Sequence, residues 1–180
     1  MAEEYPRFHH ELGLSSEPKT REAILYISSN AGFGQTRLNK ALWYADFQAF
    51  ERRGTSITGQ EYQHLQFGPA LRQMPPILRR MQNAGEIGFE DVDEFEEQRP
   101  VPSRPWQRNY LSDEDVSYLE EAIKIVSAMS AKEASEWAHG FPGWRETEQG
   151  ETIDYEWVFW SDEPLTEDEI AYGLELEPAI

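Results

Sequence analysis

Histidines are the side chains of this chain best suited to acid–base or metal chemistry. The sequence has 4 of them, His9, His10, His64 and His139. Because an imidazole titrates near neutral pH, His64 paired with a carboxylate could act as a general base, which makes a small hydrolase one hypothesis. The histidines and acids nevertheless match neither HExxH nor an EF-hand loop, and no pair has the spacing of metal ligands. We therefore expect no metal site and assign no catalytic residue.

Other motifs for nucleotide or covalent chemistry are missing or incomplete. The triplet Gly32-Phe33-Gly34 lacks the third glycine of GxGxxG and falls between two expected helices, whereas a dinucleotide site follows a strand. The sequence contains neither a P-loop nor a GxSxG elbow. It has 0 cysteines, which excludes disulfides, thiolate metal ligands and a cysteine nucleophile. These observations predict a protein that is not an enzyme and uses no cofactor.

Charge is distributed very unevenly along the chain. The formal net charge is -18, yet residues 1–85 hold 10 Lys/Arg and 8 Asp/Glu, whereas residues 86–180 hold 6 and 26. An acidic half repels phosphate backbones, which disfavours nucleic acid as a partner. It suits a basic protein partner, although a solvated acidic surface kept for solubility explains the same composition.

Basic residues are concentrated in the first half of the chain, where they could form a nucleic-acid face or stay internal. The residues concerned are Arg37, Lys40, Arg52, Arg53, Arg72, Arg79 and Arg80. A nucleic-acid face would bring them together in one groove, as a DNA-binding regulator of its own operon would require. Given the net charge, we instead expect them to lie along helix surfaces or to pair with the acidic half.

The elements that must position these residues begin with a helix that starts near residue 20. A second helix over 36–53, capped by Thr36, is apolar on nearly every side, so other elements must wrap around it. Segment 57–67 is typical of an extended strand, and Pro69 is expected to begin a helical turn. A further helix over 76–85 ends at a glycine.

The second half of the chain alternates turn signals with helical periodicity. A short strand is expected at 87–89, and the proline-rich segment 98–108 is expected to be a loop. Ser112 and Ser130 each begin a capping-box pattern followed by apolar residues at helical spacing. Thr166 begins a third such pattern before a final helix.

This order of elements predicts an α+β fold, a helix-rich single domain with a small antiparallel sheet. A winged-helix-like arrangement is the weaker alternative. Residues 1–18 are expected to form an irregular N-terminal arm, and residues 19–176 the domain. The sequence has no run of 18 apolar residues, and its acidic start lacks the apolar core of a signal peptide. We therefore expect no membrane contact and a cytoplasmic protein.

Tryptophans gather near the end of the chain, where they could serve either the core or an interface. We expect Trp43 and Trp137 in the core. Trp144, Trp157 and Trp160 fit a core and a binding surface equally well, since tryptophan is common at interface hot spots.

Two sets of sequence blocks resemble a known family. The blocks LNKALWYADF (38–47), ITGQEY (57–62) and FGP (67–69) resemble the KLLYFADF…ITGDxY…YGP pattern of the SocA-like Panacea domain. The blocks AHGFPGWR (138–145) and IDYE (153–156) are similar to the SHxxPAW and IPYE blocks of that family. The departures from the pattern are mild, and they are Gln60 for Asp, Phe67 for Tyr, Ala70 for Val, Gly143 for Ala and Asp154 for Pro.

The resemblance implies an antitoxin that neutralises a cognate protein toxin by direct binding. Members of this family bind toxins of several unrelated kinds, and one acts as an adaptor that delivers its toxin to a protease. The resemblance implies neither an enzymatic activity nor a cofactor. It also implies that the partner is a toxin, which the acidic half suggests is a basic protein.

Seven residues are our candidates for contact with that partner. Four lie in or beside the strand that follows the glycine at 59, and three lie in the acidic loop after it. They are Tyr62, His64, Gln66 and Phe67 in the first group, and Asp91, Asp93 and Glu94 in the second. The first group combines polar and aromatic side chains, and the second is dense in charge. For Tyr62, a place in the core of the fold is the stronger alternative.

Overall fold

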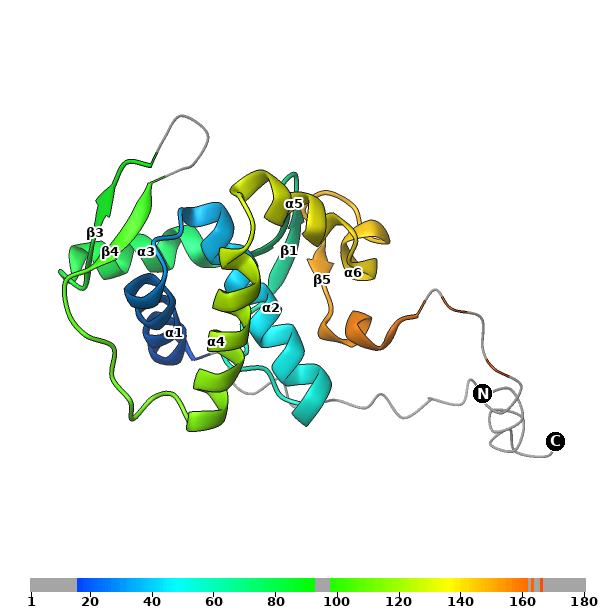
Figure 1. Cartoon of the computed structure of the whole chain (residues 1–180), viewed down its shortest axis with the longest axis horizontal. Helices are drawn as coiled ribbons and strands as arrows, with labels where there is room; N and C mark the ends of the chain where they lie inside the picture. Colours follow the sequence, from blue (N-terminus) through cyan, green and yellow to red (C-terminus); the bar gives the residue numbers. More distant parts are fainter. Residues whose placement is uncertain (1–15, 93–97, 162, 164–165, 167–180) are drawn as a thin grey trace, which may run out of the picture.

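The computed structural model describes residues 16–92, 98–161, 163 and 166. Helices dominate the described chain, and two small antiparallel sheets complete it (Figure 1). The elements are α1 (Glu17–Asn30), α2 (Gln35–Arg53), β1 (Tyr62–Leu65), β2 (Gly68–Leu71), α3 (Met74–Asn83), β3 (Ile87–Glu90), β4 (Arg99–Pro102), α4 (Asp113–Ser127), α5 (Ala131–His139), α6 (Pro142–Arg145), β5 (Thr152–Ile153) and the 3₁₀ helix η1 (Tyr155–Phe159). The predicted α+β class is confirmed.

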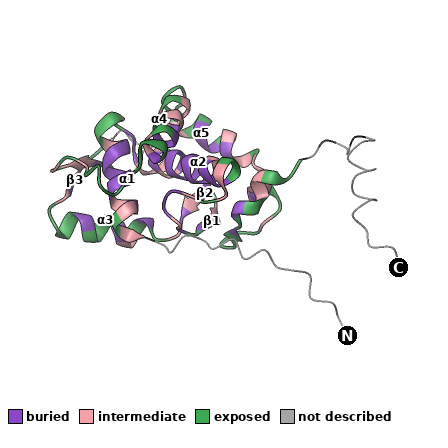
Figure 2. Cartoon of the chain, turned by 90° about the horizontal axis from the view of Figure 1, so that it is seen from below, coloured by how far each residue is buried: buried purple, intermediate pink, exposed green. Residues whose placement is uncertain are grey.

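Helix α2 is the centre of the fold, as its apolar sequence predicts. It packs against α1, α4, α5, β2 and η1. Its side chains are buried along almost the whole helix, whereas α3 is exposed over much of its surface (Figure 2). A helix with no polar face cannot lie on the surface, so the other elements are arranged around it.

The first sheet has the strand order β2-β1-β5 and is antiparallel throughout. Strands β1 and β2 form a hairpin in which Leu65 pairs with Gly68, so its turn consists of Gln66 and Phe67. We call these two residues the hairpin tip. The second sheet contains β3 and β4 alone and lies at the opposite end of the molecule from β5 and α6 (Figure 1).

Two of the expected segments have a different structure. Pro69, expected to begin a helical turn, lies in strand β2, and the proline-rich segment expected to be a loop contains strand β4. Both are edge strands of their sheets, where a residue without an N–H leaves no ladder bond unmade. Proline therefore did not exclude these strands.

Two predicted helix starts are confirmed, and two differ from the prediction. The capping boxes at Ser112 and Ser130 are confirmed, since each side chain accepts from the third backbone N–H of its helix. Gly34, rather than Thr36, is the N-cap of α2, and it makes no side-chain cap. Helix α1 begins at Glu17 and is capped by Ser16, whose Oγ accepts from the Lys19 N–H at 3.3 Å. Residues 17 and 18, predicted to belong to the arm, are thus part of α1, and Ser16 is its N-cap.

Some predictions concern residues outside the described ranges. These are the remainder of the N-terminal arm, the domain end at residue 176 and the helix expected after Thr166. Within the described chain, no helix combines the length and the apolarity needed to cross a membrane.

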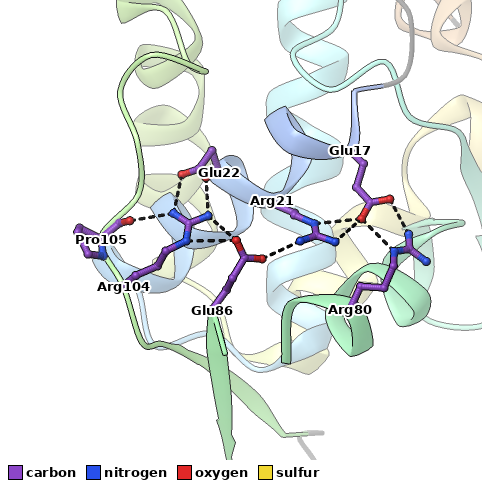
Figure 3. Close-up of polar contacts among 7 residues, drawn as sticks. All are labelled: Glu17, Arg21, Glu22, Arg80, Glu86, Arg104 and Pro105. Carbon is purple, nitrogen blue, oxygen red and sulfur yellow. Dashed lines mark hydrogen bonds and ion pairs between the residues drawn. The ribbon is translucent and has the colours of Figure 1, made fainter. Parts of the chain in front are cut away.

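A seam of alternating charges holds α1, α3 and the β3–β4 sheet together (Figure 3). Arg104 reaches Glu22 and Glu86, each at 2.6 Å. Arg21 joins Glu86 (3.0 Å) to Glu17 (2.6 Å), and Arg80 closes the row on Glu17 at 2.8 Å. We call these six residues the charged seam. It links elements from both halves of the sequence.

Candidate functional site

A buried carboxylate organises the backbone that leads into strand β1. Asp46 of α2 is 0 % exposed, and its Oδ1 accepts from the N–H groups of Ile57 and Thr58, both at 2.8 Å. Its Oδ2 accepts from the Thr58 hydroxyl (2.6 Å) and from the Tyr62 hydroxyl (2.7 Å). Burial raises the pKa of Asp46, and these hydrogen bonds oppose that rise. All four donors are neutral, so Asp46 ties the chain after α2 to the helix itself.

The burial of Tyr62 corrects its place among the candidate contacts. Tyr62 is 0 % exposed, and burial together with the nearby Asp46 raises its pKa well above the ordinary value. Its ring packs edge-on against Phe47 at 5.5 Å. Because no part of the side chain reaches the surface, Tyr62 cannot touch a partner docked on this structure. Its role is to position the strand that carries the hairpin tip.

A second buried group of α2, the ammonium of Lys40, binds the hairpin backbone. Lys40 is 2 % exposed, and its Nζ donates to the Pro69 carbonyl at 2.9 Å. Gly68 adopts φ +103°, and a Cβ added there would lie 2.9 Å from Lys40 Cε and 3.1 Å from Ala138 Cβ. Only glycine accepts both the backbone conformation and the close approach. The FGP block therefore encodes how the hairpin packs on α2 and α5.

Two imidazoles and one indole clamp the hairpin on its other side. His139 stacks on Trp144 with ring centroids 4.0 Å apart, and His64 stacks on the same indole at 4.4 Å. At these distances the two imidazoles would overlap on one face, so they cover opposite faces of Trp144. Trp144 Nε1 donates to the Leu65 carbonyl (3.0 Å), and His139 Nε2 donates to the Gln66 carbonyl (3.1 Å). We call His64, His139 and Trp144 the clamp.

The clamp also defines the hydrogen-bonding state of His64. The Thr147 hydroxyl donates to the Gly143 carbonyl at 2.6 Å, so its oxygen can only accept from His64 Nδ1, 3.2 Å away. His64 Nδ1 therefore carries a hydrogen. Its partner here is a hydroxyl, not the carboxylate that the hydrolase hypothesis required. Among the described residues, no group of three His, Asp or Glu side chains is placed to hold a metal ion.

The hairpin tip projects from this support into solvent. Gln66 is exposed, and Phe67 exposes 57 % of its side chain. The clamp binds the carbonyl of Leu65, just before the turn, and that of Gln66, within it, so the backbone at the tip is fixed while its side chains are exposed. Of the candidates near β1, the structure thus brings His64, Gln66 and Phe67 together at one surface.

The acidic candidates lie elsewhere. Asp91 follows β3, is exposed and accepts from Gln98 Nε2 at 2.9 Å. The β3–β4 sheet, which Asp91 follows, lies at the opposite end of the molecule from β5, the strand paired with β1 (Figure 1). Asp93 and Glu94 fall outside the described residues.

The expected internal pairing of basic residues is confirmed for the end of α2. Arg52 binds Glu121 at 2.8 Å, and Arg53 binds Asp115 at 2.6 Å, so both cations face the acidic helix α4. Lys40 is buried under the hairpin instead. These side chains do not gather into a basic groove.

A comparison with protein families decides what this arrangement belongs to. The family model described as "Antitoxin SocA-like, Panacea domain" matches residues 38–145, which is more than half of the chain. The chain belongs to this antitoxin family. No curated protein and no solved structure matches it significantly. The matched range runs from the start of α2 to the end of α6, so it contains Asp46, the hairpin and the clamp.

Sequence reasoning missed how the two Panacea blocks meet. The clamp joins His64 of the first block region to His139 and Trp144 of the second, and nothing in their spacing showed that they stack. Gly143, a departure from the family pattern, also has a structural reason. A Cβ there would lie 2.6 Å from Phe141 Cε1 and 2.8 Å from Trp157 Cγ, so the rings of this chain occupy the space of an alanine methyl.

Proposed function

We propose that this Panacea protein neutralises a cognate protein toxin by binding it directly, with the hairpin tip as a contact surface. The observation that supports this is the convergence of the family's sequence blocks on one task. Asp46, Lys40 and the clamp all brace a two-residue turn that exposes Phe67. A turn whose backbone is already fixed loses little conformational entropy on binding, which favours its exposed aromatic side chain as an interface anchor.

The proposed toxin is a basic protein. Residues 86–180 hold 26 Asp/Glu against 6 Lys/Arg, and α5 and α6, which flank the hairpin, belong to this half. Complementary charge accelerates association and selects among partners. We propose that the protein acts by occupying the toxin's surface and catalyses no reaction itself. Turnover of a substrate by the purified chain alone would contradict this.

Delivery of the toxin to a protease is a second mechanism that direct binding permits. The two mechanisms differ in the fate of the toxin. Occlusion leaves the toxin level constant, whereas adaptor function shortens the toxin's half-life only when the protease is present. A pulse-chase measurement of the toxin with and without this protein separates them.

Binding to DNA is less well supported than binding to protein. Arg52 and Arg53, at the end of α2, form ion pairs with Glu121 and Asp115. The net charge of the chain is -18. A regulator of its own operon would bind its promoter with an affinity that falls steeply as salt rises. Such binding by the isolated protein would favour this alternative.

The test is co-expression with the polypeptide encoded by the neighbouring gene. We expect the wild-type chain to restore growth and to co-elute with that polypeptide on gel filtration. The variant Phe67→Ala should weaken the complex by about tenfold or more, because it removes a central aromatic anchor.

The matched control is Tyr110→Ala, which truncates another exposed aromatic side chain, 42 % exposed, before α4. It should bind like the wild type. Failure of the wild-type chain to bind or to rescue growth would contradict the proposed function. Equal binding by Phe67→Ala and Tyr110→Ala would remove the hairpin tip from the interface.

A further inference from the structure

A second surface feature lies at the α5–α6 corner, which we define as the residues Gly140 and Phe141 between the two helices. It is an apolar groove of about 390 Å³ between α2, α5 and η1. Aromatic side chains from α2 and from the corner form its walls, and Val158 of η1 closes one side. The walls include Trp43, Phe47, Trp137 and Phe141. His139 belongs to the clamp, and the next residue, Gly140, lines the groove. The clamp and the groove are therefore adjacent in the chain.

The walls of the groove are rigid. Trp43 packs edge-on against Trp137 (5.3 Å) and against Phe141 (5.2 Å), and Phe47 packs edge-on against Phe141 at 5.4 Å. Edge-to-face rings held by several neighbours have few alternative rotamers. A pocket that keeps its shape without a ligand binds a side chain with little loss of conformational entropy.

One polar group of the wall has no partner. Trp43 is 5 % exposed, and its buried Nε1 donates to no described residue. A buried donor without an acceptor costs about 1–3 kcal/mol, so such groups in native proteins call for an explanation. This nitrogen is itself buried, so it offers no hydrogen bond to a partner docked on this structure and reports instead on the packing of the groove wall.

Exposed aromatic side chains extend this surface beyond the groove. The residues after Val158 are Phe159, 60 % exposed, and Trp160, 54 % exposed. The Phe159 ring lies 6.0 Å from Phe50 of α2, and Phe159 directly follows the groove residue Val158. Large exposed aromatics next to an apolar hollow are typical of protein-binding surfaces.

Charge indicates which polypeptide fits. Tyr44 also lines the groove, and its hydroxyl donates to Glu121 at 3.3 Å. Burial and then the charge of Glu121 raise the pKa of Tyr44, and Glu51 adds to the effect, so carboxylates lie at this rim. Arg52 offsets Glu121. A second copy of this chain, with its net charge of -18, would be repelled from such a rim, whereas a basic partner would be attracted.

We propose that this groove is a docking pocket for the basic toxin, which fills it with an apolar side chain flanked by lysine or arginine. The inference rests on the proposed function and extends it to a second surface. The toxin then bridges the α5–α6 corner, with the hairpin tip on one side and the groove on the other.

The test blocks the groove in two different ways. Val158→Arg places a bulky cation at its wall, and Gln48→Trp, also at the groove, fills it without a change of charge. Each should weaken the complex with the co-encoded polypeptide by at least about tenfold, as for a central hot spot. The control Glu156→Gln changes the charge of η1 by the same amount as Val158→Arg but lies outside the groove, and should change the affinity by less than about threefold.

The outcomes for groove and function are distinguishable. If the wild type binds and both blocked variants bind equally well, the groove is not the docking pocket, although the proposed function stands. If the wild type itself does not bind, the proposed function fails, and a peptide titration then decides the fate of the groove.

That titration follows the indole N–H resonance of Trp43 by NMR, assigned with Trp43→Phe. The probe is acetyl-Lys-Phe-Lys-amide, and the control peptide is acetyl-Glu-Phe-Glu-amide. We expect the basic peptide to shift the resonance in the wild type and not in Val158→Arg. No shift with the basic peptide, or equal shifts with both peptides, would overturn the inference that a basic polypeptide occupies the groove.

Discussion

The two ends of this molecule hold buried polar groups in opposite ways. At the hairpin end, Asp46 is fully buried and bound by neutral donors. At the other end, the charged seam pairs each carboxylate with an arginine, and all of its side chains except that of Glu22 are partly open to water (Figure 3). One network depends on hydrogen-bond geometry and the other on opposite charges.

This difference indicates that the hairpin end is the more rigid of the two. Hydrogen bonds between buried neutral donors and a carboxylate require close positioning, and a missing partner leaves a desolvated group unpaired. Ion pairs near the surface tolerate small displacements and are screened by salt. The rigid network fixes the start of β1, the strand that leads to the hairpin tip, where a binding surface gains from pre-organisation. The seam joins elements that line neither the hairpin tip nor the groove.

The largest effect is expected at the hairpin end. Asp46→Ala leaves the donors of Ile57, Thr58 and Tyr62 buried without an acceptor. At roughly 1 kcal/mol for each lost bond, the free energy of unfolding should fall by about 4 kcal/mol. Urea denaturation followed by tryptophan fluorescence measures it. Tyr62→Phe removes one of these donors and should cost only about 1 kcal/mol. Equal losses in both variants would show that Asp46 does not act as a common acceptor.

Two glycine-to-alanine variants compare how closely the backbone is packed at the hairpin and in the β3–β4 sheet. Gly68→Ala should destabilise the protein by about 2–3 kcal/mol, because it combines a left-handed backbone with a clash against Lys40. Gly88 of β3 has no atom within 4 Å of its virtual Cβ, so Gly88→Ala should be neutral or stabilise by up to about 1 kcal/mol. Thermal melts of both variants check this. A stable Gly68→Ala protein would mean that the hairpin can move off α2.

The sequence predicted the elements that depend on local signals. The helix over 36–53, apolar on nearly every side, and the capping boxes at Ser112 and Ser130 were evident because periodicity and capping act over a few residues. Strands β2 and β4 were missed because proline argues against a strand unless the strand lies at an edge. Whether a strand is at an edge depends on the whole sheet, which no local pattern contains.

The candidate site was predicted only in part for a similar reason. His64, Gln66 and Phe67 were selected for their chemistry, and the structure brings them to one surface. Tyr62, two residues before His64, lies on the same side of the strand but is buried, because this part of β1 packs on Asp46 and Phe47 of α2. The clamp pairs residues about 75–80 positions apart, so its existence follows from tertiary packing alone.

The contributions of the two networks to stability should also depend differently on salt. Arg104→Ala removes the cation between Glu22 and Glu86, and Glu22 is almost fully buried. The loss should be about 2 kcal/mol in low salt, because a buried carboxylate is left without its cation. It should shrink in 1 M NaCl, whereas the loss caused by Asp46→Ala should stay constant. Urea denaturation at both salt concentrations checks this. A loss for Arg104→Ala that does not depend on salt would contradict the contrast.

The smallest effect, and the sharpest contrast, is the sign of the pH dependence. A hydrogen bond from Arg80 lowers the pKa of Glu17 against the opposing effect of burial, and Arg21 contributes to the lowering. Glu17 therefore stabilises the folded state above its ordinary pKa, and this contribution is lost as the pH falls through the lowered value. Burial raises the pKa of Asp46, so its proton is bound more tightly in the folded state. That contribution is present at low pH and is lost as the pH rises through the raised value.

Two conservative variants isolate these contributions. The difference in unfolding free energy between the wild type and Glu17→Gln should be below about 1 kcal/mol at pH 7 and should vanish towards pH 3. The difference between the wild type and Asp46→Asn should change in the opposite direction and favour the wild type more at acidic pH than at neutral pH. Urea denaturation from pH 3.5 to pH 7 measures both. If the two differences followed the pH in the same direction, the two ends would not hold their carboxylates by different means, because only a raised pKa at one end and a lowered pKa at the other produce opposite slopes.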